Sequence, residues 1–318
     1  MPLCVPGNGC ANEDCCYRSR RSRRLLWCAA CRLRLSGYVC RARASFPEAI
    51  KANGLRVHSS RGDLRLPRVS VVERMDRLEL PDLVLVAVKL WDTQSVAAEL
   101  APIASQGAAI LSLQNGVDKD DILRRYVPAE SVLGGCCYIS ASIAEPGLIR
   151  HTGSIQRIVF GEYNGERSSR AANFLEACQQ ASIDVELTGS IERVIWEKFV
   201  FLVGLSGTTT SMRQSIGPIL ANAQTRAFLL DVMREVVAVG LSCGVNLSKG
   251  YAEERLAFCD SLPASMTSSM HHDLDEGRRL ELPWLSGAVS RLAHGSGVST
   301  PLNRAISDVL TFYAEGRR

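Results

Sequence analysis

The stretch PDLVLVAVK (residues 81–89) decides the fold class of this chain. Six consecutive apolar residues follow Pro-Asp, and such a run without polar alternation is typical of a strand buried on both faces of a parallel sheet. Helical spacing follows over residues 93–103, and a second apolar run, AAILSL, occupies residues 108–113. Strands that alternate with helices predict right-handed crossovers and a doubly wound α/β sheet.

The same alternation continues to about residue 189 and then gives way to helices. We expect one helix near residues 118–126, and three strands at 131–136, 155–161 and 184–187. Beyond residue 190 the apolar spacing predicts helices at 191–205, around 228–239, at 267–277 and at 283–294. We therefore predict a Rossmann-like nucleotide-binding domain over residues 1–189 and an all-helical domain over residues 190–318.

Two polar residues fall directly after the first two apolar runs. Lys89 follows the first run, and Asn115 follows the second within Gln114-Asn115-Gly116. Ligands of doubly wound sheets bind outside the carboxyl ends of the strands. Solvated loop residues would give the same pattern, but the matching positions on consecutive strands favour a binding site.

Composition excludes several classes of function. The 318 residues carry a net charge of +4, but nine arginines against two acids give residues 1–45 a charge of +7, so the remainder is about −3. A weakly acidic main body gives no reason to expect a nucleic-acid partner. No run of eighteen apolar residues predicts a membrane span, and no apolar signal-peptide segment precedes the arginines. The five cysteines beyond residue 45 are expected to be reduced core residues of a cytoplasmic protein.

The first 45 residues differ from the rest of the chain. They contain seven of the twelve cysteines and no lysine. Gly7, Gly9 and Asn12 form a G-x-G-x-x-N string, which resembles the phosphate loop of dinucleotide-binding folds. A fingerprint of this kind requires a preceding apolar strand and a third glycine, and here MPLCVP and Asn12 stand in those places.

Lys198 and Glu281 are the residues of the second half that could carry chemistry. Lys198 lies between Trp196 and Phe199 in an apolar helix, where desolvation would lower the pKa of an ammonium group and make it a useful general acid. The alternative is a solvated helix edge. Glu281 precedes Pro283 at a helix start, where the helix dipole alone would also favour a carboxylate. We expect Lys198 to face Glu281 across the gap between the two domains.

Other polar pairs favour structural interpretations. Ser268 and Ser269 are typical of a helix cap or a first turn. The adjacent His271 and His272 point to different helix faces, which favours a surface pair over a metal site. Cys136-Cys137 is expected to lie in the core. We predict no metal ligands in this part of the chain.

Seven segments between residues 46 and 318, in order, resemble the ketopantoate reductase (2-dehydropantoate 2-reductase) family. They are EAIKANGLRVHS (48–59), VAVKLWDT (86–93), SLQNGV (112–117), RHTGSIQRIVFGE (150–162), WEKF (196–199), SSMHHDLDEGRRLEL (268–282) and GVSTPLN (297–303).

This resemblance implies an NADPH-dependent oxidoreductase that reduces a small-molecule 2-oxo acid, with a place in pantothenate biosynthesis and a homodimer as one arrangement. Lys198 would be the catalytic lysine, and Glu281 would act with it on the substrate. Ser269 and Asn115 would bind substrate. The cofactor would contact residues that match the family's binding positions, which are Gly7, Gly9, Asn12, Arg43, Lys89 and Asn115.

The chain departs from the family in two places. Leu202, Ser206 and Met266 replace family asparagines, which indicates a less polar pocket and favours a 2-oxo acid other than ketopantoate. Gly7 and Arg43 are thirty-six residues apart, whereas about 20 is expected between phosphate loop and ribose contact.

Three hypotheses address the aberrant N-terminus. Residues up to about 42 would be read in a shifted frame, which would explain the arginine and cysteine enrichment. A catalytically impaired relative, unable to bind dinucleotide and acting as a binding protein, is the second. The third is a small zinc module built on Cys10, Cys15, Cys28 and Cys31.

Overall fold

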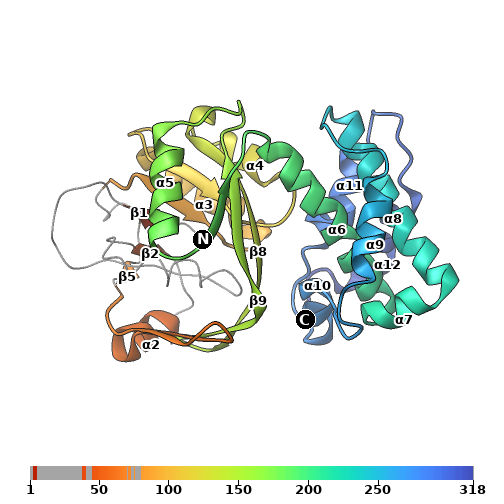
Figure 1. The fold of residues 1–318 in the computed structure, drawn as a ribbon, viewed down its shortest axis with the longest axis horizontal. Helices are drawn as coiled ribbons and strands as arrows, with labels where there is room; N and C mark the ends of the chain where they lie inside the picture. Colours follow the sequence, from red (N-terminus) through yellow and green to blue (C-terminus); the bar gives the residue numbers. More distant parts are fainter. Residues whose placement is uncertain are drawn as a thin grey trace. The chain divides into compact units, whose positions relative to one another are not determined.

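The computed structural model describes residues 3–5, 38–40, 45–69, 71–72, 75 and 80–317. Within these residues the chain divides into two compact units (Figure 1). Unit 1 comprises Met1–Asn115 and Lys119–Ile191, and unit 2 comprises Gly116–Asp118 and Glu192–Arg318, as far as each is described. The chain therefore enters unit 2 briefly after Asn115 and returns to unit 1 at Lys119.

The described strands of unit 1 form one sheet, in the order β4-β3-β9-β8-β7-β6-β1-β2-β5, with β10 paired to β9. The strands are β1 (Leu3–Val5), β2 (Tyr38–Cys40), β3 (Leu55–Ser59), β4 (Leu64–Leu66), β5 (Val71–Val72), β6 (Leu83–Val86), β7 (Ala109–Ser112), β8 (Val132–Glu145), β9 (Leu148–Gly161) and β10 (Asp184–Leu187).

Short helices connect these strands. They are α2 (Ser45–Asn53), η3 (Leu90–Asp92), α3 (Thr93–Ala104), α4 (Lys119–Arg124), η4 (Ala129–Ser131) and α5 (Ser169–Gln180). The predicted alternation of strands and helices is confirmed from β6 to β8 and again from β9 to β10. Ser168 caps α5, since its side chain accepts a hydrogen bond from the Ala171 amide.

The central strands β6, β7 and β8 are parallel, as their continuous apolar runs predict. The sheet as a whole is mixed, because β8 and β9 form an antiparallel hairpin of two fourteen-residue strands. β1 also differs from the expected parallel arrangement: it runs antiparallel to β6, with Val5 opposite Leu83. Its carboxyl end therefore lies beside the start of β6.

Two glycines allow the backbone to approach closely around this hairpin. A Cβ atom on Gly135 of β8 would lie 2.6 Å from the carbonyl oxygen of Ser112. A Cβ atom on Gly161, at the end of β9, would lie 2.1 Å from the Thr188 carbonyl oxygen. Any side chain at either position would force the neighbouring segment to move.

Unit 2 is helical throughout its described part. Its elements are α6 (Ile191–Met212), α7 (Ile216–Ala221), α8 (Ala223–Ser242), α9 (Tyr251–Cys259), α10 (Ser269–Asp275), η5 (Leu282–Trp284), α11 (Ser286–Leu292), α12 (Pro301–Leu310) and η6 (Thr311–Tyr313). The prediction of one helix over residues 283–294 is wrong. Leu285 has φ −108° and ψ −105°, and this non-helical backbone separates η5 from α11.

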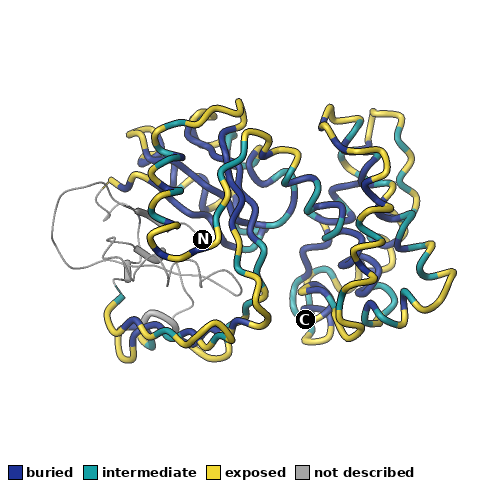
Figure 2. The backbone as a smooth tube through the Cα atoms, viewed as in Figure 1, coloured by how far each residue is buried: buried dark blue, intermediate teal, exposed yellow. Residues whose placement is uncertain are grey.

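Each unit has its own hydrophobic core (Figure 2). In unit 1 the core is built from β6, β7, β8 and β9 with apolar side chains of α3 and α5. In unit 2 it is built from α6, α8, α11 and α12. Cys136, Cys137, Cys178 and Cys259 are buried, as expected, but Cys243 is exposed because it is the C-cap residue of α8.

Candidate active site

Lys89 and Asn115 lie just beyond the carboxyl ends of two neighbouring central strands. Val86 and Ser112 are register partners at the ends of the parallel strands β6 and β7, and each polar residue follows its strand by three positions. Both side chains belong to half-buried residues. Lys89 has extended backbone (φ −65°, ψ 151°), and its Nζ lies 5.4 Å from the centroid of the Trp91 ring. The structure thus brings these two predicted site loops to one strand edge.

A buried amide connects the two loops. The Gln114 side chain is 3% exposed, and its Nε2 donates to the Val88 carbonyl oxygen at 3.1 Å and to Thr93 Oγ1 at 2.7 Å. Its Oε1 accepts a hydrogen bond from Ser112 Oγ at 3.0 Å. Thr93 Oγ1 in turn donates to the Leu90 carbonyl oxygen at 2.8 Å. The Val88 carbonyl is therefore held by Gln114, and the Leu90 carbonyl is held by Thr93, which itself accepts from Gln114.

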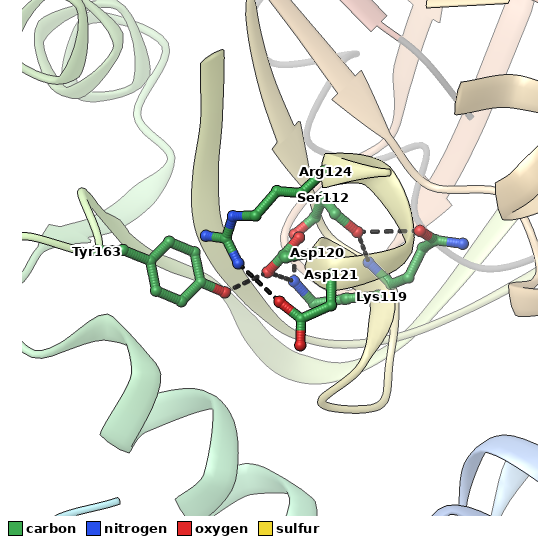
Figure 3. Close-up of polar contacts among 7 residues, drawn as sticks. Ser112, Lys119, Asp120, Asp121, Arg124 and Tyr163 are labelled. Atoms are coloured by element: carbon green, nitrogen blue, oxygen red, sulfur yellow. Dashed lines mark hydrogen bonds and ion pairs between the residues drawn. The ribbon is translucent and has the colours of Figure 1, made fainter. Parts of the chain in front are cut away.

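A buried ion pair continues this network (Figure 3). Lys119 Nζ donates to Asp120 Oδ2 at 2.5 Å and to the Ser112 carbonyl oxygen at 3.3 Å, and both charged side chains are 1% exposed. Tyr163 Oη donates to the same Asp120 oxygen at 2.6 Å, while the Arg124 guanidinium stacks 3.9 Å from the Tyr163 ring centroid. Burial, followed by the Asp120 charge, raises the pKa of Tyr163.

Sequence reasoning missed this polar network. Gln114, Lys119 and Asp120 stand in a loop and at the start of a short helix, where polar residues are usually solvated. The one available signal was their position beside Asn115, directly after a strand expected to be buried. The contact from Gln114 to Val88, twenty-six residues earlier in the chain, depends on the tertiary fold.

The remaining predicted cofactor contacts, Gly7, Gly9, Asn12 and Arg43, lie outside the described residues. The described part of β1 nevertheless bears on them. In dinucleotide-binding folds the phosphate loop follows the first strand at the carboxyl edge of the parallel sheet. Here β1 is antiparallel to β6, so its carboxyl end lies at the opposite edge from Lys89.

Lys198 lies on α6 of unit 2. Trp196 and Phe199 beside it are buried, and their rings meet edge to face with centroids 5.7 Å apart. Lys198 itself is half-buried. The first turn of α6 exposes Glu192 and Arg193, whereas every residue from Val203 to Thr210 is buried. The lysine therefore stands at the border between the apolar core and solvent.

Glu281 also belongs to unit 2, immediately before η5, and its residue is 7% exposed. Its side chain does not cap that short helix. Lys198 and Glu281 both belong to unit 2. That their side chains face each other stays a prediction. A cation and a carboxylate are thus both kept within the helical unit, as the predicted site requires.

The two adjacent serines at the start of α10 have different surroundings. Ser268 is the N-cap residue: its buried Oγ accepts from the His271 amide at 3.1 Å and from Thr209 Oγ1 at 3.1 Å. Ser269 is exposed on the first turn. The structure therefore assigns the capping role to Ser268 and leaves the Ser269 hydroxyl accessible for a ligand.

The predicted surface pair His271-His272 is half wrong. His272 is exposed, but His271 is 7% exposed, with Nε2 3.5 Å from Asp275 Oδ2. Burial lowers the pKa of His271, and the Asp275 carboxylate acts in the opposite direction.

Positions that depart from the family pattern are apolar or small. Leu202, one turn after Lys198 on α6, is half-buried and packs against the core of unit 2. Ser206 is fully buried, and its Oγ has no hydrogen-bond partner among the described residues. Met266 is 36% exposed. That these three residues line a pocket with few amide groups stays a prediction.

Two other kinds of feature are absent from the described residues. They include no group of three or more His, Cys, Asp or Glu residues arranged to hold a metal ion. None of their helices combines the length and apolar character that crossing a membrane requires. The proposed zinc ligands at residues 10, 15, 28 and 31 lie outside this part of the chain.

The described part of the chain combines a Rossmann-like α/β unit, with polar residues after its central strands, and a helical unit that contains Lys198 and the buried Glu281. The chain belongs to the ketopantoate reductase family. The family model described as ketopantoate reductase PanE/ApbA matches residues 29–165, and the model of its C-terminal domain matches residues 190–314.

Individual relatives agree with this assignment. The chain is 32% identical over 261 residues to a 2-dehydropantoate 2-reductase of Halobacterium salinarum, covering 82% of this chain and 85% of the relative. It is 30% identical over 267 residues to the uncharacterized oxidoreductase YkpB of Bacillus subtilis, with 84% and 87% covered. A solved 2-dehydropantoate 2-reductase of Geobacter metallireducens superposes with a TM-score of 0.83 at 27% identity, covering 92% and 98% of the two chains.

Proposed function

We propose that this chain reduces the carbonyl group of a 2-oxo acid to a hydroxyl group with NADPH as the reductant, as a 2-dehydropantoate 2-reductase-like enzyme. The observation that carries the proposal is the placement of Lys198, half-buried beside Trp196 and Phe199, in a unit that also holds the buried Glu281. NADPH, when bound, supplies the hydride.

Lys198 supplies the proton and the positive charge in this proposal. As negative charge develops on the carbonyl oxygen, the ammonium group stabilises it and then transfers one proton to it. The products are the 2-hydroxy acid and NADP⁺, with the lysine left neutral until solvent returns its proton. Its position at the border of the core keeps that return path open.

Four further residues bind and orient in this proposal. Glu281 and Ser269 hold the hydroxyl and carboxylate ends of the substrate, and both belong to unit 2. Asn115 and Lys89 orient the nicotinamide end of the cofactor at the strand edge of unit 1. In this proposal Asn115 and Lys89 bind the reactive end of the dinucleotide. Orienting the cofactor and the substrate in this way contributes to lowering the activation barrier of hydride transfer.

The substrate we infer is a 2-oxo acid with a more apolar side chain than ketopantoate. Leu202 stands one helical turn from Lys198, so an apolar group would lie near the reacting carbonyl. A hydroxyl group bound against leucine would lose its hydrogen bonds to water without replacement. We therefore expect 2-oxo acids with branched aliphatic side chains to be better substrates than ketopantoate.

Replacing Lys198 with alanine tests the proposed role. We expect Lys198→Ala to lower kcat by roughly a factor of 10² to 10⁴, the usual contribution of a positioned general acid, while NADPH affinity stays nearly unchanged. NADPH oxidation is followed by absorbance with a panel of 2-oxo acids. Lys249→Ala is the matched control, since Lys249 is an exposed lysine of the same unit. Equal turnover in both variants would remove Lys198 from the mechanism.

One observation favours a second candidate function, a family member that does not bind dinucleotide and acts as a binding protein. The antiparallel β1 places its carboxyl end at the sheet edge opposite to Lys89. A phosphate loop that follows such a strand would start at the wrong edge. A fluorescence titration of the purified chain with NADPH separates this candidate from the reductase, because only the reductase shows saturable binding.

A further inference from the structure

The buried side-chain amide of Gln114 forms hydrogen bonds outside its own loop as well as within it. Its two donors and its acceptor are all used: Nε2 donates to Val88 and Thr93, and Oε1 accepts from Ser112. Thr93 and Ser112 are both fully buried, and Gln114 is 3% exposed. A buried amide with complete partners holds one orientation, because any rotation would leave polar groups unpaired.

The contacts of this amide lie on both sides of Lys89. Val88, directly before Lys89, accepts from the amide itself. Leu90, directly after Lys89, accepts from Thr93 Oγ1, the same oxygen that accepts from Gln114. The Gln114 side chain therefore holds the Val88 carbonyl directly and the Leu90 carbonyl through Thr93.

The same residue is covalently adjacent to Asn115. The Gln114 amide nitrogen donates to Ser112 Oγ at 3.3 Å, and the Leu113 amide donates to the Val86 carbonyl oxygen at 2.8 Å, so the segment that leads to Asn115 is fixed as well. The Gln114 side chain reaches the same segment through Ser112 Oγ, which donates to its Oε1, so this one side chain contacts both the Lys89 loop and the end of β7 that leads to Asn115.

We propose that Gln114 is a positioning residue that couples the Lys89 loop to the Asn115 loop and so sets the spacing of the two groups that would hold the nicotinamide end of the cofactor. The inference rests on the proposed function for its ligand. The coupling itself is a property of the protein without cofactor.

Hydrogen exchange of the cofactor-free chain tests the coupling. The Asp92 amide donates to the Lys89 carbonyl oxygen at 2.9 Å, and the Leu113 amide donates to Val86, so each reports on one loop. In Gln114→Met, which keeps the length of the side chain but removes its amide, we expect both amides to exchange about tenfold faster or more. Amides in the middle of α3 and α5 should keep their wild-type rates.

Gln106→Met is the matched control. The Gln106 amide donates to the Pro102 carbonyl oxygen four residues earlier and connects no separate segments. It should leave both reporter amides unchanged. Uniformly faster exchange across unit 1 in Gln114→Met would mean general destabilisation and would overturn the proposal, as would unchanged exchange at Asp92.

Thr93→Val provides a second variant that keeps Gln114. It removes one acceptor of the amide and the bond to Leu90, while the bond from Gln114 to Val88 is kept. We expect faster exchange at Asp92 with little change at Leu113. Equal acceleration at both amides would contradict a coupling that runs through Gln114.

An NADPH fluorescence titration extends the test to the cofactor. Gln114→Met should weaken NADPH binding about tenfold if the two loops must be fixed before binding. If Gln114→Met binds NADPH as tightly as wild type, the positioning role is overturned. If wild type does not bind NADPH, the proposed function fails, and the exchange experiment still decides whether Gln114 couples the loops.

Discussion

At the residue scale, the buried ion pair of Lys119 and Asp120 carries a large desolvation cost. Two charged side chains, each 1% exposed, lose almost all their hydration. Their mutual contact, the Tyr163 hydroxyl and the Ser112 carbonyl offset that loss. Removing one partner from such a group leaves an uncompensated charge, which costs far more than the pair contributes.

Lys119→Met should therefore lower the free energy of unfolding by about 3–5 kcal/mol. Urea denaturation measures the change. Arg304→Ala is the control, because Arg304 forms an ion pair with Asp308 in which the side chains are 70% and 58% exposed, and its loss should cost less than about 1 kcal/mol. Similar costs for the two variants would show that the Lys119–Asp120 pair is hydrated in solution.

His271 makes stability depend on pH. Burial is the largest cause of its lowered pKa, and nearby His272 and Arg213 act in the same direction. The unfolded chain, with an ordinary histidine pKa of about 6.5, then binds more protons than the folded chain as pH falls below that value. Stability that is fully present above about pH 6.5 is lost as the pH decreases towards the lower, folded pKa.

We expect His271→Gln to make unfolding less sensitive to pH in this window, whereas the exposed His272→Gln should behave like wild type. Urea midpoints at pH 7.5 and 5.5 provide the comparison. An identical pH dependence in His271→Gln and wild type would mean that His271 has the same pKa in both states.

At the element scale, the start of α10 separates stability from binding. Ser268 accepts a hydrogen bond from the His271 amide and is buried, whereas Ser269 is exposed on the first turn. A cap satisfies an orphan amide of the helix, and an exposed hydroxyl does not. Neighbouring serines in one motif thus have different tasks.

Ser268→Ala should lower the free energy of unfolding by about 1 kcal/mol, the usual cost of losing a serine cap. Ser269→Ala should leave it within about 0.5 kcal/mol and instead raise KM for the 2-oxo acid. Thermal unfolding and steady-state kinetics of both variants check this. If Ser269→Ala melts lower and leaves KM unchanged, the substrate role of Ser269 is wrong.

Sequence patterns were sufficient for most elements where propensity and burial agree. The apolar runs at β6 and β7 and the long helices α6 and α8 follow directly from their periodicity. They were insufficient where tertiary context decides. The break at Leu285 has no proline or glycine at that position, and the antiparallel direction of β1 depends on pairing with β6.

At the scale of the whole molecule, the predicted site residues are distributed over two units with separate cores. Asn115 is the last residue of unit 1 before the chain enters unit 2 at Gly116–Asp118. Within unit 2, Asp118 Oδ2 accepts from Arg291 Nη2 at 2.5 Å. Asn115 is therefore directly followed by a segment that is fixed in the other unit.

The site was only partly predictable from sequence. Lys198 has a physical signature, an ammonium in an apolar helix, and Lys89 and Asn115 follow buried strands. Ser269 and Glu281 depend on the family resemblance, because a serine and a glutamate near helix starts are common for structural reasons. Gln114 had only its position beside Asn115 as a signal, since its importance depends on partners distant in sequence.

The binding of NADPH by the full chain, measured by fluorescence titration and followed by oxidation of the bound cofactor with 2-oxo acids, tests the account most directly. We expect saturable binding and 2-oxo-acid-dependent oxidation, with Lys198→Ala binding NADPH but failing to oxidise it. Absence of saturable NADPH binding by the folded wild-type chain would contradict the proposed reductase activity. It would favour the second candidate function, a binding protein that does not bind dinucleotide.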